Sequence, residues 1–432
     1  MIRPLKGIEN IFSNPNSQDN ILLGIKFTDS KYVLQVAENF KKIFSGLRLQ
    51  VTDGKYYRKK EQEIPIYKIP NWIQDCKSAN LYVFNNQMVP YTESLASLSM
   101  NDKILVVSSS HALSDGGYMV SVLSRCMDDF SQEKANNEAP LYSSDAFKEE
   151  FNEAEKKFDK KIIWPMDKLT TCKYDTNDSH LAPPGTQYIE NEVVIPVEKL
   201  ACYNKKTKKP QSLSDVSCVG VAMSILALNK VNHDIDFTYN EPLSLTAILD
   251  VRRFSKNKSK IDWRFGNCIA QPTIKAEVTK NDTIEDVAKK IRDYINLLKP
   301  HGVFYCAGHM SELLNKPPKA IIGCHSGIGP IKFKRPIVDF DLRDCIRLTP
   351  GKGDHGEQHG TMFGVISYSK VNEFRNDLCY VSRIWPSCMT IENGKILCES
   401  FKYFITKVPI SASFDSALHD LINFQRSVKK SF

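Results

Sequence analysis

The sequence predicts an α/β fold made of two sandwich-like halves. The chain has 432 residues, which is more than one ordinary hydrophobic core accommodates, so two domains of about 200 residues each are expected. Helical and strand patterns occur together in both halves, as α/β sandwiches require. A polar stretch at 168–187 contains a Pro-Pro-Gly break at 183–185. We therefore predict an N-terminal domain at 1–167, a crossover linker at 168–187 and a C-terminal domain at 188–432.

Apolar periodicity predicts the elements of the first half. Between residues 31 and 44 apolar side chains recur every three or four positions, which indicates an amphipathic helix. Short runs rich in β-branched and aromatic residues indicate strands. We expect strands at 20–27, 47–51 and 81–84 and from residue 104, and helices at 31–44, about 116–130 and 143–161.

The second half shows the same mixture of elements. Residues 216–231 are strongly apolar, which predicts a buried helix. Thr283 precedes an acidic residue and an apolar periodic run, so it is expected to cap a helix that reaches residue 298. The remaining patterns predict strands at 188–195 and 243–251, short strands across 319–408 and a closing amphipathic helix at 413–428.

The composition is typical of a soluble globular protein, with 42% hydrophobic and 25% charged residues. The net charge of +8 is spread along the chain, so we expect no nucleic-acid partner. No stretch approaches the roughly 18 apolar residues of a membrane span, and the N-terminus has no apolar signal segment. The twelve cysteines form no CxxC pair, which favours reduced, packed thiols and a cytoplasmic location.

One hexapeptide, His111-Ala-Leu-Ser-Asp115-Gly116, has the pattern of an acid–base site. It follows an apolar run that predicts a strand, and a glycine pair then leads into a helical pattern. A histidine at a strand end can hold its imidazole at the mouth of a cleft and take a proton from a hydroxyl or amine. Asp115 is close enough to brace the turn, and Gly116 allows a tight bend.

The HxxxDG pattern at 111–116 resembles the catalytic motif of the chloramphenicol-acetyltransferase-like acyltransferases. This superfamily includes plant BAHD acyltransferases, alcohol O-acetyltransferases, mycobacterial polyketide-associated acyltransferases and the condensation domains of nonribosomal peptide synthetases. The sequence looks nearest to stand-alone alcohol O-acetyltransferases and polyketide-associated types. Other segments resemble the family in the right order: the R-x-L-x-x-x-E opening at 3–9, the H-x-x-L-R position at 44–48, the D-x-R-x-R strand at 249–253, the F-G-N turn at 264–268, the S-N-x-G turn at 325–329 and a late strand pair at 389–397.

The resemblance implies acyl transfer without a covalent enzyme intermediate, in a channel between the two domains. His111 would be the general base that takes the proton of an acceptor hydroxyl or amine as the acceptor attacks a thioester. Asp115 would be a structural brace that points away from substrate and pairs with an arginine. Arg252 is slightly favoured over Arg48 as that partner.

Three further residues are candidates by the same resemblance. Gly116 would keep room for the thioester channel, Asn267 would form a structural turn and Ser326 would place a hydroxyl in the cleft. No permanently bound cofactor is expected, because acyl-CoA is a substrate. The expected partners are a small-molecule acyl donor and an alcohol or amine acceptor, and a site completed within one chain predicts a monomer.

The sequence also departs from its relatives. The plant-type D-F-G-W-G is absent, Ser110 replaces the first His of the condensation-domain HHxxxDG, and Gly327 replaces the Asn of S-N-x-G. The donor is therefore open between acyl-CoA and a thioester on an acyl carrier protein. A condensation-type enzyme with carrier-bound donors and a non-catalytic binding module on the same fold are the alternatives. Channel walls in this superfamily come from variable loops, so the acyl length and the acceptor are not specified by these motifs.

A glycine-rich stretch at 351–360 offers a competing site. Its His355 and His359 are four residues apart, which on a helix would place both on one face. Four glycines within these ten residues argue against a helix. We therefore predict a loop at this position and no metal.

Overall fold

The computed structural model describes residues 3–13, 17–58, 64, 66–127, 140–158, 170–173, 175, 188–255, 266–309, 320–348 and 362–431. The chain divides into two units. Unit 1 consists of Met1–Lys148, Ser255–Ile269 and Lys332–Arg347, and unit 2 of Glu149–Phe254, Ala270–Ile331 and Leu348–Phe432. This division differs from the contiguous domains expected at 1–167 and 188–432, because two later segments fold into unit 1.

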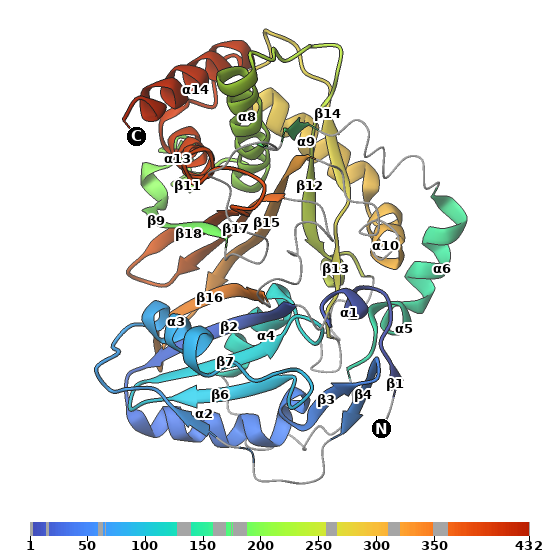
Figure 1. Cartoon of the computed structure of the whole chain (residues 1–432), viewed down its shortest axis with the longest axis vertical. Coiled ribbons are helices and arrows are strands. Elements are labelled where there is room, and N and C mark those ends of the chain that lie inside the picture. The colour runs from blue at the N-terminus through green and yellow to red at the C-terminus, as the bar shows by residue number, and fades with distance from the viewer. Residues whose placement is uncertain are drawn as a thin grey trace. The chain divides into compact units, whose positions relative to one another are not determined.

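A five-stranded sheet forms the centre of unit 1, in the order β16 (Ile337–Leu348), β2 (Ser17–Phe27), β7 (Ile104–Ser110), β6 (Ala96–Met100) and β5 (Ile66–Lys68) (Figure 1). Strand β7 runs antiparallel to both of its neighbours, and all seven of its residues are buried. Strand β16 comes from much later in the sequence and pairs with β2. That pairing explains why the segment containing β16 belongs to unit 1.

Three helices pack against this sheet: α2 (Ser30–Ile43), α3 (Cys76–Asn86) and α4 (Gly116–Arg125). Helix α2 confirms the amphipathic pattern, and Asp29 caps it by accepting a hydrogen bond from the backbone of Lys31. The strand predicted at 81–84 is wrong, because these residues lie in α3. A short apolar run does not distinguish strand from helix. Here Asp75 caps the helix by accepting a 2.8 Å hydrogen bond from the Ser78 amide.

The remaining elements of unit 1 are short. The strand predicted at 47–51 begins only at Leu49, because the preceding residues form a 3-10 turn at Ser45–Arg48. A small sheet and two short helices complete the unit: β1 (Arg3–Pro4), β4 (Lys55–Arg58), β3 (Leu49–Thr52), α1 (Ile8–Ile11) and α5 (Ser143–Ala146).

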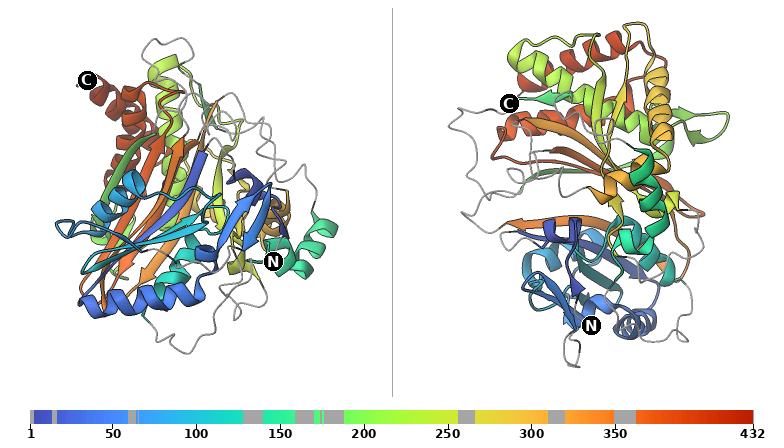
Figure 2. Two further views of the ribbon diagram at one scale, coloured as in Figure 1. Left: turned by 60° about the horizontal axis from the view of Figure 1, so that its bottom comes forward. Right: turned by 90° about the vertical axis from the view of Figure 1, so that its right-hand side faces the viewer.

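Unit 2 is built on an eight-stranded sheet (Figure 2). Its main path runs β13 (Ile269–Ala270), β12 (Leu243–Asp250), β15 (Ile321–Lys332), β17 (Met362–Val371), β18 (Asn376–Ile384) and β9 (Ile189–Pro196), with β14 (Thr273–Ala276) on β12 and β8 (Thr171–Cys172) on β15. The strands predicted at 188–195 and 243–251 are confirmed. The short strands expected across 319–408 are instead long strands followed by a helix.

Four helices pack together over one face of this sheet (Figure 1): α8 (Leu213–His233), α9 (Ile284–Leu298), α13 (Ile391–Lys407) and α14 (Phe414–Lys429). Thr283 caps α9 as predicted, and the Asp286 carboxylate accepts a hydrogen bond from the Thr283 amide at 3.0 Å. The expected closing helix is α14, with Ser413 as its cap. The shorter elements are α6 (Lys148–Lys157), α10 (His301–Gly308), β10 (Tyr203–Asn204), β11 (Lys209–Pro210) and 3-10 turns at Val197–Lys199 and Val251–Phe254.

Helix α8 confirms the buried helix predicted at 216–231. By length and composition it is the one helix in the described ranges that could cross a membrane, but 83% of that apolar window is buried inside the protein. A Cβ at Gly220 would stand 2.5 Å from a ring carbon of Phe404, so α8 packs closely against α13. None of the twelve cysteines is in a disulfide and all are buried, in agreement with their expected packing as small hydrophobes.

The late strand pair expected at 389–397 is wrong, because this segment begins helix α13. Thr390 caps the helix and accepts a 3.2 Å hydrogen bond from the Asn393 amide. The Asn-Gly pair that favours a hairpin turn therefore lies in the first turn of a helix. A Cβ at Gly394 would stand 2.5 Å from Ile189 of β9, so glycine here permits close contact between helix and sheet.

Candidate active site

His111 directly follows β7 in unit 1. Its backbone amide donates a 2.7 Å hydrogen bond to the carbonyl of Asp19, which continues the β2–β7 pairing by one residue. The chain then turns, and the Leu113 amide donates to the Ser110 carbonyl at 2.9 Å. His111 is only 9% exposed. The expected position of the histidine at a strand end is therefore confirmed.

Asp115 caps helix α4 with one carboxylate oxygen and holds a distant segment with the other. Its Oδ1 accepts from the Tyr118 amide at 2.8 Å, and its Oδ2 accepts from the Cys268 amide at 2.6 Å. The residue is 1% exposed. Hydrogen bonds to an ionised carboxylate are stronger than neutral ones, so this geometry fits a structural brace.

Asn267 contacts His111 directly. Its side-chain nitrogen Nδ2 donates to the His111 carbonyl oxygen at 2.7 Å and lies 3.0 Å from the ring nitrogen Nδ1. The neighbouring Gly266 passes so close to the turn that a Cβ there would stand 2.7 Å from the Leu113 carbonyl oxygen. The segment of Gly266, Asn267 and Cys268, called the GNC segment below, thus contacts the hexapeptide at three points.

Phe12 covers one face of the His111 imidazole. The two rings are stacked, with centroids 3.9 Å apart and planes within 9° of each other. Phe12 follows the short helix α1, which begins just after Gly7. No spacing or composition signal in the sequence connects this phenylalanine with the histidine.

Arg3 and Glu9, the first and last residues of the R-x-L-x-x-x-E segment, form an ion pair. Arg3 donates to both carboxylate oxygens of Glu9, at 2.6 and 2.8 Å, and its guanidinium lies 4.7 Å from the centre of the Tyr56 ring. Burial opposes the charge of Arg3, but hydrogen bonding and attraction to Glu9 raise its pKa overall.

Tyr56 connects Arg3 with the hexapeptide. Its hydroxyl donates a 2.7 Å hydrogen bond to the carbonyl oxygen of Ala112, the residue after the histidine. The side chain is fully buried, and this burial raises the pKa of Tyr56 well above its usual value. Tyr56 is therefore a neutral, permanent donor at this position.

The other candidates lie elsewhere, and their roles stay predictions. Arg252 belongs to unit 2, where its Nε donates to Asp250 at 2.7 Å. Arg48 belongs to unit 1 and donates to the backbone carbonyls of Lys41 and Lys42. Neither contact joins Asp115.

Ser326 lies in strand β15 of unit 2, opposite Ile248. The preceding His325 is buried between Ser367, whose Oγ lies 3.0 Å from Nε2, and the Cys218 sulfur, 3.6 Å from Nδ1. Burial lowers the pKa of His325 to about 4, so its ring is neutral near pH 7. These contacts make His325 part of the packing between the sheet and α8.

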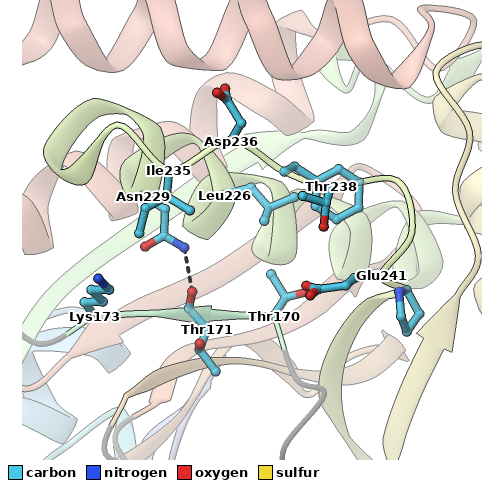
Figure 3. A pocket seen from close by; sticks show the side chains of 11 residues that line it. Thr170, Thr171, Lys173, Leu226, Asn229, Ile235, Asp236, Thr238 and Glu241 are labelled. Atoms are coloured by element: carbon cyan, nitrogen blue, oxygen red, sulfur yellow. Dashed lines mark hydrogen bonds between the residues drawn. The ribbon is translucent and has the colours of Figure 1, made fainter.

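Unit 2 also has a hollow of about 300 Å³ at one end of α8 (Figure 3). Asn229 donates from Nδ2 to the Thr171 carbonyl at its edge, 2.6 Å away. No histidine or cysteine is among the described residues that line it. The lining residues are Thr170, Thr171, Lys173, Leu226, Asn229, Ile235, Asp236, Phe237, Thr238, Glu241 and Pro242.

Within the described ranges, no group of three or more His, Cys, Asp or Glu side chains could hold a metal ion. His355 and His359 of the glycine-rich stretch lie outside those ranges. Two side chains hold the His111 imidazole in place. Phe12 fixes its ring plane, Asn267 engages Nδ1, and Nε2 makes no hydrogen bond in the part of the chain that the structure describes.

Solved structures share this fold along nearly the whole chain. Polyketide synthase associated protein 5 from Mycobacterium tuberculosis is similar with a TM-score of 0.62 and 13% identity, over 94% of this chain and 98% of that one. The starter condensation domain of rhizomide synthetase, as a double mutant in complex with C8-CoA and Leu-SNAC, has a TM-score of 0.61 and 11% identity over 96% of both chains. The epimerization domain from the third module of tyrocidine synthetase B has a TM-score of 0.61 and 12% identity, over 99% and 98%.

No protein-family model matches the sequence, and no curated protein is significantly similar to it. The structural likeness is therefore one of fold. The chain shares the α/β fold of these solved structures, which confirms the predicted fold class.

Proposed function

We propose that the protein is an acyltransferase that moves an acyl group from a thioester, acyl-CoA, to a hydroxyl or amine acceptor. The observation that carries the proposal is the support around His111. An aromatic stack, a side-chain amide and a strand pairing all hold this one histidine. Enzymes hold reacting groups by such supporting contacts, because small misplacements are costly in rate.

The acyl group passes directly from the thioester to the acceptor, without a covalent enzyme intermediate. The acceptor oxygen or nitrogen attacks the thioester carbonyl carbon while the His111 imidazole takes the acceptor's proton. The tetrahedral intermediate then collapses, the carbon–sulfur bond breaks, and the imidazolium returns the proton to the leaving thiolate. The products are an ester or amide and a free thiol, and the imidazole is neutral again.

Asp115 and Gly116 serve this step indirectly. Asp115 holds the start of α4 and the GNC segment, so it maintains the position of the histidine without handling the proton. Gly116 follows as the first residue of α4, and the lack of a side chain there keeps room for the thioester.

The resemblance to condensation domains also implies a second candidate, in which a carrier protein presents the acyl thioester. The same bond is broken in both cases, so the role of His111 is unchanged. One of these neighbours is in complex with C8-CoA, which supports CoA as a donor for this fold. A binding module without catalysis is the remaining alternative.

The test is thiol release from acetyl-CoA and longer acyl-CoAs, with a panel of alcohols and amines. We expect acceptor-dependent release that His111→Ala abolishes without unfolding the protein. His419→Ala is the matched control, because His419 is an exposed residue of α14 that forms a hydrogen bond with Asn423. Equal release by wild type and His111→Ala would contradict the proposal. Release only from thioesters loaded on a carrier protein would replace acyl-CoA as the donor.

A further inference from the structure

Trp72 is an exposed tryptophan on the outside of unit 1. Its side chain is 77% exposed, whereas Ile69 and Ile73 of the same loop are each 3% exposed and pack in a core cluster with Leu22 and Val83. Tryptophan carries a large apolar area and is highly buried on average. An indole ring left in water between two buried isoleucines therefore requires an explanation.

The loop that carries Trp72 is firmly attached to the rest of unit 1. The side chain of Asn101 donates to the Ile73 carbonyl at 2.9 Å, and the side chain of Asn71 donates to the Asp102 carboxylate at 2.8 Å. These bonds fix the loop on both sides of the tryptophan. Because the backbone is already ordered, binding a partner through this ring costs little conformational entropy.

Two lysines lie close to the end of this loop. The Lys26 ammonium, at the end of β2, donates a 2.6 Å hydrogen bond to the Gln74 carbonyl. Lys77 is exposed in the first turn of α3, which begins directly after the loop. Positive charge is thus placed beside the exposed ring.

Three more basic residues reach the same end of the sheet through backbone contacts. Two consecutive amides at the end of β2 donate to the carbonyls of Lys103 and Pro336, at 2.8 and 2.9 Å. The second contact brings the segment of Lys334 and Arg335 beside β2. The side chains of Lys103, Lys334 and Arg335 are all exposed.

The exposed ring and its basic neighbours form what we call the Trp72 patch, which consists of Trp72, Lys26, Lys77, Lys103, Lys334 and Arg335. Three carboxylates lie in the same region, but each accepts a hydrogen bond from unit 1 itself: Asp29 from the Lys31 amide, Asp75 from the Ser78 amide and Asp102 from Asn71. The five basic side chains outnumber these carboxylates, so the patch attracts anions.

We infer that the Trp72 patch docks the protein on an anionic phospholipid membrane. Clusters of four to eight basic residues bind anionic headgroups in this way. An indole ring is stable at the membrane surface, because its apolar body enters the acyl region while its N–H stays near water. A stable protein partner would instead need about 800 Å² of matching surface, and a single ring on a loop tip suits a flat, soft surface better.

A nucleic acid is the other anionic polymer that a basic surface attracts. Proteins that bind single strands use a groove in which successive bases stack on several aromatic side chains. The described residues of the patch offer one ring only, so the membrane is the better match. The inference concerns where the protein is held, and it does not depend on the proposed acyl transfer.

The test is co-sedimentation of the full chain with vesicles of phosphatidylcholine, with or without phosphatidylserine, in the absence of other substrates. At about 0.1 M salt, charges act over about 10 Å, and we expect binding only to the vesicles that contain phosphatidylserine. At about 1 M salt this distance falls to about 3 Å, and the binding should be lost.

Two variants locate the docking surface. Trp72→Ala should lower the partition coefficient at least about tenfold, since burial of a large apolar side chain contributes more than this. The triple variant Lys103→Gln, Lys334→Gln, Arg335→Gln should also lower it at least about tenfold, because each basic residue near an anionic surface contributes roughly fivefold. All four side chains are exposed, so both variants should keep the melting temperature of the wild type.

Matched controls make the same changes in unit 2. Phe374→Ala removes another exposed ring. The triple variant Lys205→Gln, Lys206→Gln, Lys208→Gln removes the same charge from the exposed turn between β10 and β11. Both controls should stay within about twofold of the wild type, because charges beyond the screening length act weakly.

Four outcomes would overturn the inference. The first is no binding, or equal binding to both kinds of vesicle. The second is undiminished binding by Trp72→Ala, and the third is an equal loss in the unit 2 lysine control, because each would assign docking to another surface. The fourth is binding of a short single-stranded DNA or RNA, lost in Trp72→Ala, by a protein that does not bind vesicles.

Fluorescence gives a second readout of the ring itself. Lipids with brominated acyl chains quench an indole that enters the membrane. The difference between the spectra of the wild type and Trp72→Phe isolates the emission of Trp72. We expect this difference to be quenched by brominated vesicles that contain phosphatidylserine. An unquenched difference in sedimenting protein would show that the ring stays in water, which would overturn the inference.

Discussion

The backbone amide of Cys268 donates a 2.6 Å hydrogen bond to Oδ2 of Asp115. Together with the bond from Asn267 to His111, this contact fixes both ends of the hexapeptide to one short segment from a distant part of the sequence. The position of the imidazole therefore depends on residues that do not themselves handle the proton. The following variants measure how strongly each of these contacts acts.

Asp115→Asn should destabilise the protein and lower its activity. Both carboxylate oxygens accept from backbone amides, of Tyr118 and Cys268. An asparagine would turn its NH2 group toward one of these donors. We expect a loss of about 1–3 kcal/mol in the free energy of unfolding, measured by urea denaturation, and a lower kcat.

The control for this variant is Asp145→Asn, because Asp145 forms an exposed ion pair with Lys6. Exposed pairs contribute little to stability, so this control should resemble wild type. If Asp115→Asn left both the melting temperature and turnover unchanged, Asp115 would not be a brace.

Tyr56→Phe should leave the Ala112 carbonyl without its buried donor. The variant removes the 2.7 Å hydrogen bond from the tyrosine hydroxyl. We expect the free energy of unfolding to fall by about 1–3 kcal/mol. Tyr239→Phe provides the comparison, since the Tyr239 hydroxyl donates to Asp415 in an exposed contact. Equal unfolding free energies for the two variants would argue against a supporting role for Tyr56.

Phe12→Ala should lower kcat with little effect on the melting temperature. The variant removes the stacked ring from His111, and an aromatic pair contributes enough to change the rate roughly three- to tenfold. Steady-state kinetics at saturating donor measure the effect. Phe374→Ala is the control, because that phenylalanine is 82% exposed. A kcat equal to that of the control would mean that the stack does not orient the imidazole.

Gly266→Ala tests the close approach of the GNC segment. The new Cβ would stand 2.7 Å from the Leu113 carbonyl oxygen, which is backbone and does not move easily. We expect the free energy of unfolding to fall by about 1–3 kcal/mol and turnover to decrease. Thermal melting and thiol release measure the two effects. Gly364→Ala should be mild, since its Cβ would be 3.6 Å from Arg383. A neutral Gly266→Ala would show that the segment is free to shift.

His325 should make the stability of the protein depend on pH. Burial lowers its pKa from 6.5 to about 4, so the unfolded chain binds a proton between these values and the folded chain does not. The free energy of unfolding should therefore fall as pH falls from 6.5 to about 4 and lose on the order of 3 kcal/mol. Urea denaturation at several pH values measures this slope. His325→Gln should flatten it, and an equal slope in the variant would assign the effect to other groups.

Local patterns predicted the helices with clear caps and strong periodicity. Thr283 and Ser413 cap α9 and α14, close to the expected starts of these helices, and the strand before His111 ends at Ser110, directly before the histidine. The failures were short runs whose state depends on distant packing. Residues 81–84 join a helix, and the Asn-Gly pair of α13 lies against β9.

Some residues of the candidate site could be identified from the sequence, and others only from the structure. The hexapeptide and Asn267 carry motif signals, so they could be identified from the sequence. Phe12 and Tyr56 could not, because nothing in their neighbourhoods distinguishes them from ordinary aromatic residues. Their roles arise from the folding of the N-terminal segment beside β7. The contact of Asn267 with the ring also required three dimensions, since the motif suggested only a structural turn.

The pairing of β16 with β2 has a consequence for the making of this protein. The first 148 residues contain four of the five strands of their sheet, and the fifth, β16, begins only at Ile337. At about 5–20 residues per second, a ribosome needs roughly 10–40 s to synthesise the intervening stretch. During that time β2 is an edge strand whose backbone hydrogen-bonding groups are unpaired on one side. Such edges can pair with strands of other chains. We therefore expect the nascent chain to depend on shielding by chaperones until β16 emerges, although the finished protein has no such need.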